Sequence, residues 1–107
     1  MIEYSDNFLQ EAKKLSKKYK HLKSDLKDAA EEIETQKDFG TSLGYRLYKK
    51  RVANSSIPTG KSGGFRIIIY QRVEDKIVLI SIYSKTQKET LSDEELKAVL
   101  KAYMEER

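Results

Sequence analysis

The stretch GKSGGFRIIIYQRVEDKIVLISIYSKTQK, residues 60–88, decides the fold that this sequence predicts. Residues 65–72 and 77–83 are rich in Ile, Val and Tyr, which favour pleated strands, and the polar segment between them is short enough for a hairpin turn. The run IVLISIY is the only dense apolar run in the chain, so it predicts a central strand. The hairpin carries cations at both ends, namely Lys61, Arg66, Lys85 and Lys88.

Length and composition predict one small soluble domain that spans residues 1–107. The chain has 107 residues, 38% of them hydrophobic, which is enough for one modest core and too few for two ordinary domains. The absence of cysteine excludes a disulfide framework, a thiolate metal site and a cysteine nucleophile. The N-terminal MIEYSDNF lacks the pattern of a signal peptide, and no apolar run reaches the roughly 18–20 residues that span a bilayer. We therefore expect a cytoplasmic protein with no membrane partner.

The positive charge is concentrated on the segment that contains the predicted strands. Residues 44–88 hold 10 Lys and Arg against 2 acidic residues, whereas residues 1–43 hold 8 against 9 and residues 89–107 hold 3 against 6. A one-sided basic field is typical of proteins that bind a polyanion, with nucleic acid as the first candidate. The alternative is that these side chains only solvate exposed strand faces.

A short strand at residues 2–4 and two helices are predicted before the hairpin. Ser5 or Asp6 can cap the first helix, because their side-chain oxygens accept from unpaired backbone N–H groups. The apolar stripe of the first helix is Phe8, Leu9, Ala12, Leu15 and Tyr19, and that of the second is Leu22, Leu26, Ala29 or Ala30, and Ile33. The lysines outside the first stripe are interpreted as a solvated outer face. They are Lys13, Lys14, Lys17 and Lys18.

One more strand is predicted at residues 45–53, between loops at 36–44 and 54–64. Its period of two residues places Lys49 and Arg51 on the same face, about 6–7 Å apart. Neither face of this strand is wholly apolar, so at least one of them is expected to meet solvent.

A last helix is predicted after the hairpin, because Ser92 and Glu95 have the spacing of a capping box. Its apolar stripe is Leu96, Val99, Leu100 and Tyr103. The predicted fold is therefore α+β in the order β-α-α-β-β-β-α, with an antiparallel sheet and the helices packed on one face. The basic residues are expected on the other face of the sheet or at its exposed edge.

The stretches GYRLYKKRV, GKSGGFRIIIY and IVLISIYSKTQKETLSDEEL resemble the RelE/ParE superfamily of toxins from bacterial toxin–antitoxin modules, most closely its RelE/HigB-like mRNA interferases. The resemblance covers about residues 45–100, and the N-terminal helices agree with it by their order only. It implies cleavage of messenger RNA without a metal or other cofactor, in many members in the ribosomal A site, beside 16S rRNA. It also implies a partner antitoxin that wraps around the toxin and neutralises it.

The resemblance further implies a catalytic surface of Lys, Arg and Tyr residues on one face of the sheet. Arg66 falls on the arginine that recurs at the start of the third strand of the family, and Lys85 on the basic residue after the last strand. Lys49 and Arg51 fall on the paired basic residues of the preceding strand. A toxin of this kind would bring these four side chains together.

One position departs from the family pattern, because Leu91 stands where RelE itself carries a tyrosine. Tyr83 is the residue expected to substitute for it. RNA cleavage without metal needs a base for the 2′-OH, a cation for the phosphate and an acid for the leaving 5′-oxygen. Arg66 is predicted as a bidentate phosphate clamp, and the roles of base and acid stay open among Lys49, Lys85 and Tyr83. The side chains expected to hold RNA backbone or ribosomal RNA are Lys61, Lys88 and Arg46.

Two other functions stay open at this point. A ParE-like toxin would bind DNA gyrase and would need no catalytic cations. A non-catalytic RNA-binding domain would use the same basic face with tyrosines as stacking platforms for bases. The tyrosines in question are Tyr45, Tyr48, Tyr70 and Tyr83.

Several chemistries are not predicted for this chain. His21 is the only histidine, so a scheme with two histidines as acid and base is excluded. The only acidic residues of the hairpin, Glu74 and Asp75, belong to its turn, which argues against a two-metal nuclease. An antitoxin helix or strand would need an exposed apolar groove, for which the first helix and the sheet edge are the candidates.

Overall fold

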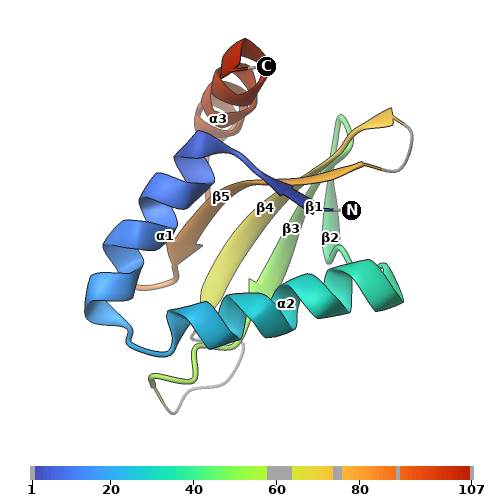
Figure 1. The fold of residues 1–107 in the computed structure, drawn as a ribbon. Helices are drawn as coiled ribbons and strands as arrows, with labels where there is room; N and C mark the ends of the chain where they lie inside the picture. Colours follow the sequence, from blue (N-terminus) through green and yellow to red (C-terminus); the bar gives the residue numbers. More distant parts are fainter. Residues whose placement is uncertain (1, 58–63, 74–75, 89, 107) are drawn as a thin grey trace.

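The computed structural model describes residues 2–57, 64–73, 76–88 and 90–106 (Figure 1). The elements are β1 (Ile2–Tyr4), α1 (Asp6–Lys18), α2 (Leu22–Gln36), β2 (Thr41–Gly44), β3 (Leu47–Val52), β4 (Phe65–Gln71), β5 (Ile77–Ser84) and α3 (Asp93–Glu106). Every predicted strand and helix is present, and the α+β class is confirmed. The structure adds one strand, β2, to the predicted order.

The five strands form one mixed sheet in the order β1-β5-β4-β3-β2. All neighbours are antiparallel except β1 and β5, which run parallel. The prediction of a wholly antiparallel sheet is therefore wrong for β1, which joins the sheet beside a strand distant in sequence. β1 pairs only with residues 77–79, so the later half of β5 has no strand on that side.

The extra strand arises from a tight hairpin that the sequence analysis assigned to a loop and a longer strand. Residues 41–44 pair with β3, and Tyr45 and Arg46 form the turn with φ of 53° and 64°. These left-handed residues cannot continue a strand, so β3 begins at Leu47 and not at residue 45. The predicted alternation along β3 is confirmed from Leu47 onward, where burial changes with side-chain direction.

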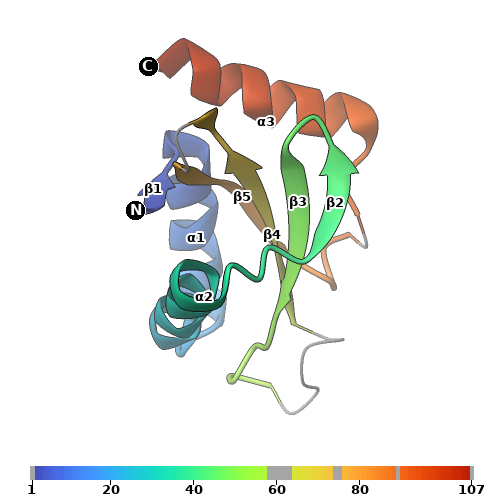
Figure 2. The ribbon, with the colours of Figure 1, turned by 90° about the vertical axis from the view of Figure 1, so that its right-hand side faces the viewer.

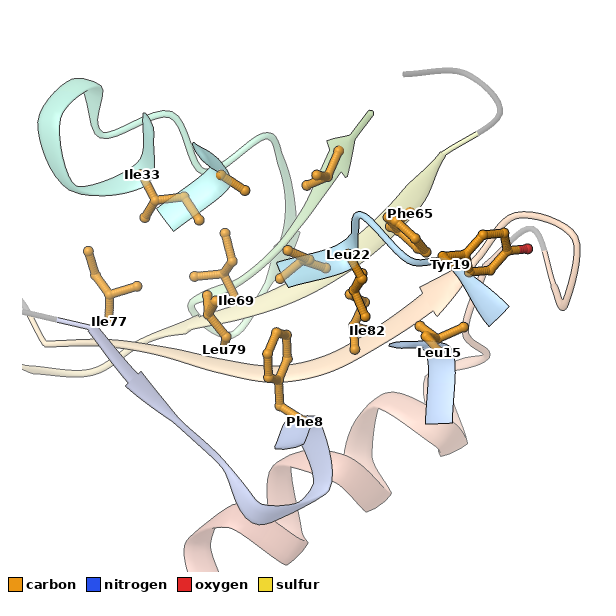
Figure 3. Close-up of a cluster of buried hydrophobic side chains, with 13 residues drawn as sticks. Phe8, Leu15, Tyr19, Leu22, Ile33, Phe65, Ile69, Ile77, Leu79 and Ile82 are labelled. Atoms are coloured by element: carbon orange, nitrogen blue, oxygen red, sulfur yellow. The ribbon is translucent and has the colours of Figure 1, made fainter. Parts of the chain in front are cut away.

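Helices cover both faces of the sheet, as Figure 2 shows. On the α1–α2 face, side chains such as Phe8, Leu22 and Ile69 form one apolar cluster (Figure 3). On the opposite face, here called the α3 face, Ile68, Val78 and Tyr103 belong to a second cluster. The prediction that the helices share one face therefore fails for α3. β5 is apolar at nearly every position because both of its faces are covered.

Helix α3 is fixed at its start by the predicted capping box. The backbone N–H of Ser92 donates to a Glu95 carboxylate oxygen at 3.0 Å, and the Glu95 N–H donates to the Ser92 hydroxyl at 3.1 Å. The Lys88 ammonium also donates to Glu95, at 2.7 Å. Lys88, predicted to bind RNA, is therefore held by α3 in this structure. Ser5 caps α1 as predicted, accepting from the Phe8 N–H at 3.0 Å.

The capping box predicts a pH dependence of stability. Hydrogen bonds from Lys88 and Ser92 lower the pKa of Glu95 from 4.5 to about 2. Because folding lowers the pKa of Glu95, the stabilisation that its carboxylate contributes is complete above pH 4.5. It is lost as the pH falls through about 2. We expect the melting temperature of Glu95→Gln to lie below that of the wild type at neutral pH and to converge with it at the acidic end. Circular dichroism melts across this range measure it.

Glu94→Gln is the control for this prediction, since Glu94 lies in the same helical turn. At every pH, the melting temperature of Glu94→Gln should lie closer to that of the wild type than the melting temperature of Glu95→Gln does. A difference in melting temperature between the wild type and Glu95→Gln that does not change with pH would contradict the role of the Glu95 carboxylate in the capping box.

Candidate functional site

Three predicted site residues form a row across the middle of the sheet. In the strand register, Arg51 of β3 lies opposite Arg66 of β4, and Arg66 lies opposite Tyr83 of β5. Directly opposed residues have Cβ atoms about 4.5–5.5 Å apart, so the side chains are immediate neighbours. Their sequence neighbours Val52, Phe65 and Ile82 belong to the α1–α2 cluster, which places the row on the α3 face. We call these three side chains the arginine row.

Lys49 lies beside the row on the same face. It is two residues before Arg51 on β3 and opposite Ile68, which belongs to the α3 cluster. Lys50 points to the other face, where its ammonium contacts Glu32 at 2.9 Å and Asp38 at 3.1 Å. The predicted separation of Lys49 and Arg51 from Lys50 is therefore confirmed, and Lys50 has a structural role.

The two arginines of the row lie toward the end of β3 and β4 that is away from the α3 cluster. That cluster includes residues 68 and 70 of β4 and residues 78, 80 and 83 of β5, so Tyr83 belongs to both the cluster and the row. Arg51 is exposed, while Arg66 retains only 5% of its surface and Tyr83 is equally buried. On the β3 side the row opens into a hollow of about 620 Å³ that Lys49 and Arg51 line with Gly40 and Leu43.

The environment of Arg66 favours an anion. Burial lowers the pKa of its guanidinium, Arg51 lowers it further, and Tyr83 opposes the change. Arginine nevertheless stays charged in proteins, so two cations lie side by side with one of them desolvated. Like charges directly opposed on a sheet are destabilising. A guanidinium can hold a phosphate through two parallel hydrogen bonds, so this pair of arginines has the chemistry to bind one.

Tyr83 is placed to give a proton and not to take one. Burial raises the pKa of its hydroxyl above 10.0, although Thr90 and then Arg66 oppose the rise. The hydroxyl is therefore neutral at physiological pH. It makes no hydrogen bond to any part of the chain that the structure describes. A buried neutral hydroxyl beside a guanidinium can donate a proton to a leaving oxygen, whereas it is a poor base.

The position of Leu91 explains how Tyr83 relates to the missing tyrosine. Leu91 is buried in the α3 cluster together with Tyr83, and its backbone lies close to the Tyr83 hydroxyl. The two sequence positions therefore meet at one place in the fold. The contact of Thr90 with the site was not predicted, because a polar residue in an irregular segment gives no periodic signal.

The remaining predicted residues are not all brought to the row. Lys85 is exposed directly after β5, and its N–H donates to the Gly64 carbonyl at 3.1 Å. Arg46 lies in the β2–β3 turn, about 16 Å along β3 from Arg51, so it is not brought to the row. Lys61 lies outside the described residues.

The tyrosines proposed as stacking platforms are mostly occupied by packing. Tyr48 packs against Phe39 with ring centroids 5.2 Å apart, and Tyr70 packs against Tyr103 at 6.2 Å. Tyr45 is 87% exposed but lies in the turn with Arg46, far from the row. A continuous aromatic platform beside the basic residues is therefore not formed.

An apolar groove of about 1030 Å³ lies between α1 and α2, as expected near the first helix. Its lining includes Leu9, which is 53% exposed, and the smaller side chains of Ala12 and Ala30. Lys23 and Lys27 stand one helical turn apart along the α2 side.

Among residues 2–57, 64–73, 76–88 and 90–106, no cluster of three or more His, Cys, Asp or Glu side chains is placed to hold a metal ion. Within the same ranges, none of the helices combines the length and the apolar character needed to cross a membrane.

The mixed sheet, which carries Arg51, Arg66 and Tyr83 in a row, defines a basic α+β domain. The family model described as RelE toxin of RelE / RelB toxin-antitoxin system matches residues 8–105, and the chain belongs to this family. The family assigns it the role of a toxin with an antitoxin partner. No curated protein matches the chain.

Proposed function

We propose that this toxin is a metal-independent endoribonuclease that cuts messenger RNA on the translating ribosome and so inhibits translation. Residues 1–107 act as one cytoplasmic toxin domain, with the message and the 16S rRNA of the A site as its RNA partners. The observation that carries the proposal is the arginine row, in which buried Arg66 lies between Arg51 and Tyr83.

Each member of the site has a role in the reaction. Arg66 and Arg51 bind the scissile phosphate and neutralise the charge that develops on its oxygens. Lys49 or Lys85 accepts the proton of the 2′-OH as its oxygen attacks phosphorus. The bond from phosphorus to the 5′-oxygen breaks, and Tyr83 gives that oxygen its proton. The products are a 2′,3′-cyclic phosphate and a 5′-hydroxyl.

The antitoxin is proposed to lay a helix in the groove between α1 and α2. The apolar lining that includes Leu9 would receive the apolar stripe of such a helix. Acidic residues of that helix would complement Lys23 and Lys27 at one end of the α2 side, and basic residues would complement Glu31 and Glu34 at the other end.

The chemistry of the cut ends tests the proposed reaction. A message that carries a single 2′-deoxynucleotide at the cut position should resist cleavage there and be cut normally elsewhere. The downstream fragments of an unmodified message should accept a labelled phosphate from polynucleotide kinase without prior dephosphorylation, because their 5′ ends are hydroxyls. Cutting at the 2′-deoxynucleotide would contradict the mechanism.

Tyr83→Phe separates the catalytic role of this hydroxyl from a structural one. We expect cleavage to slow by about 10²–10⁴-fold, the usual contribution of a general acid. The free energy of unfolding should stay the same or rise, because the variant removes a buried hydroxyl that has no described partner. Cleavage rates and urea unfolding measure the two effects. An unchanged rate would contradict the role as acid, and a large loss of stability would show that the hydroxyl supports the fold.

A further inference from the structure

Helix α1 runs beside β5 in the same direction, and its contacts advance residue by residue along the strand (Figure 1). The Asn7 amide donates to the Ile80 carbonyl at 3.0 Å. One turn later, a Glu11 carboxylate oxygen accepts from the Ser81 hydroxyl at 2.8 Å and from the Ile82 N–H at 3.2 Å. Because β1 pairs only with residues 77–79, α1 lies next to the part of β5 that no strand covers.

Two lysines continue the stripe of α1 that makes these contacts. Asn7, Glu11, Lys14 and Lys18 are spaced four, three and four residues apart, which keeps them on one side of an α-helix. As the first two contact residues 80–82, the other two lie farther along, beside the end of β5. Both lysines are exposed, and they are about 6 Å apart along the helix axis.

Contacts at Tyr19 place Lys18 next to the exit of β5. The Lys18 ammonium lies 5.3 Å from the centre of the Tyr19 ring. The Tyr19 ring packs edge-on against the Phe65 ring, with centroids 5.3 Å apart, and Phe65 lies opposite Ser84 in the strand register. Figure 3 shows the Tyr19 hydroxyl pointing out of the apolar cluster. Lys85 directly follows Ser84, so Lys18 lies in the neighbourhood of Lys85.

The arginine row points toward these lysines. It crosses the sheet from β3 through β4 to Tyr83 on β5, and the uncovered edge of β5 comes next in that direction. Glu11, the acidic member of the α1 stripe, is already hydrogen bonded to β5. A polyanion leaving the row over this edge would therefore meet Lys85, Lys18 and Lys14 in turn.

We propose that Lys14, Lys18 and Lys85 form a second RNA contact, a lysine track that holds phosphates of the message strand where it leaves the arginine row. The track rests on the proposed function, because its ligand is the RNA that the row would cut. Flexible ammonium groups hold phosphates as point charges without reading the sequence. The track therefore adds affinity and no base preference, and it replaces the interpretation of these two α1 lysines as a merely solvated face.

The salt dependence of RNA binding tests the track, with a matched pair of double variants on one helix. The variants are Lys14→Gln/Lys18→Gln and, as control, Lys13→Gln/Lys17→Gln, whose side chains lie about 100° around α1 from the track. Fluorescence anisotropy with a short single-stranded 2′-O-methyl RNA, which resists cleavage, gives the affinity at several salt concentrations. Both variants lose the same charge and should keep the fold.

We expect the track variant to reduce the slope of log affinity against log salt by about 1.4, at about 0.7 per phosphate contact on a single strand. The control variant should reduce this slope by less than half as much as the track variant does. Equal slopes in the two variants, or no binding of this RNA by the wild type, would overturn the track. The track would also be overturned if the track variant bound empty ribosomes more weakly but bound the single-stranded RNA as the wild type does. The lysines would then contact ribosomal RNA and not the message. If the wild type cuts no message but the salt slopes of the two variants still differ as expected, the track stands and the proposed nuclease function fails.

Discussion

Replacing Arg66 by alanine is expected to slow message cleavage by about 10²–10³-fold, the usual cost of removing one donor that stabilises a developing oxyanion. Arg66 is the buried member of the arginine row and lies opposite both Arg51 and Tyr83. Without its guanidinium, the phosphate loses its most desolvated cation. Arg66→Lys restores the charge but not the planar pair of donors, so it should recover part of the rate. Initial cleavage rates in a cell-free translation system measure both variants.

Arg46→Ala is the matched control for this experiment, since it removes an exposed arginine at the far end of β3. Its cleavage rate should stay far closer to the wild-type rate than that of Arg66→Ala, because Arg46 is not part of the arginine row. Melting curves of all three variants show whether a loss of rate comes from unfolding. A folded Arg66→Ala protein that cuts as fast as the wild type would contradict the role of the arginine row.

Gly40→Ala is expected to cause a large loss of stability for the addition of one methyl group. A Cβ atom at Gly40 would lie 2.3 Å from the Lys49 carbonyl oxygen and 2.8 Å from the Lys50 Cα. Both are backbone atoms of β3 and cannot turn away as a flexible side chain would. Overpacking together with the strain of a side chain at φ +83° should cost about 3–5 kcal/mol. The displaced strand carries Lys49, so cleavage should fall as well.

Gly44→Ala isolates the clash from the backbone strain. Gly44 has nearly the same φ, +85°, but its Cβ would meet nothing within 4 Å. This variant should lose only about 1–2 kcal/mol. The mid-range costs differ by about 2.5 kcal/mol, so thermal unfolding should place Gly40→Ala about 10–20 °C below Gly44→Ala. Equal melting temperatures of the two variants would show that the backbone at Gly40 does not lie as close to β3 as in this structure.

The sequence predicted the elements whose patterns are local. Alternation along β3 correctly separated Lys49 and Arg51 from Lys50, and the capping signals at Ser5 and Ser92 predicted the starts of two helices. These features depend on neighbours within a few residues, which the sequence displays directly.

Features that depend on long-range pairing were predicted less well. β2 was assigned to a loop because a four-residue edge strand carries no alternation of its own. The position of α3 was wrong because its apolar stripe does not say which face it covers, although the unbroken apolar run of β5 was a sign of two covered faces. Arg66 was predicted as a clamp, but its place between Arg51 and Tyr83 follows from strand register.

The chemical roles of the site residues also depend on the fold and could not be predicted from local sequence patterns. The sequence left Tyr83 open as acid or base, and only its burial in the fold favours the acid. The lysines of α1 carry no sign of function in their own pattern. Lys18 gains a sign of function because Tyr19 packs against Phe65, which lies opposite Ser84, and this packing brings Lys18 to the end of β5.

The most direct test of the central claim is primer extension on a message that is being translated in a cell-free system, after addition of the purified wild-type protein. The account predicts discrete new 5′ ends within the translated region, together with a fall in protein synthesis. It also predicts more cutting on translating ribosomes than on the same message without ribosomes. An intact message, whether translation continues or stops, would contradict the assignment of this toxin as a nuclease.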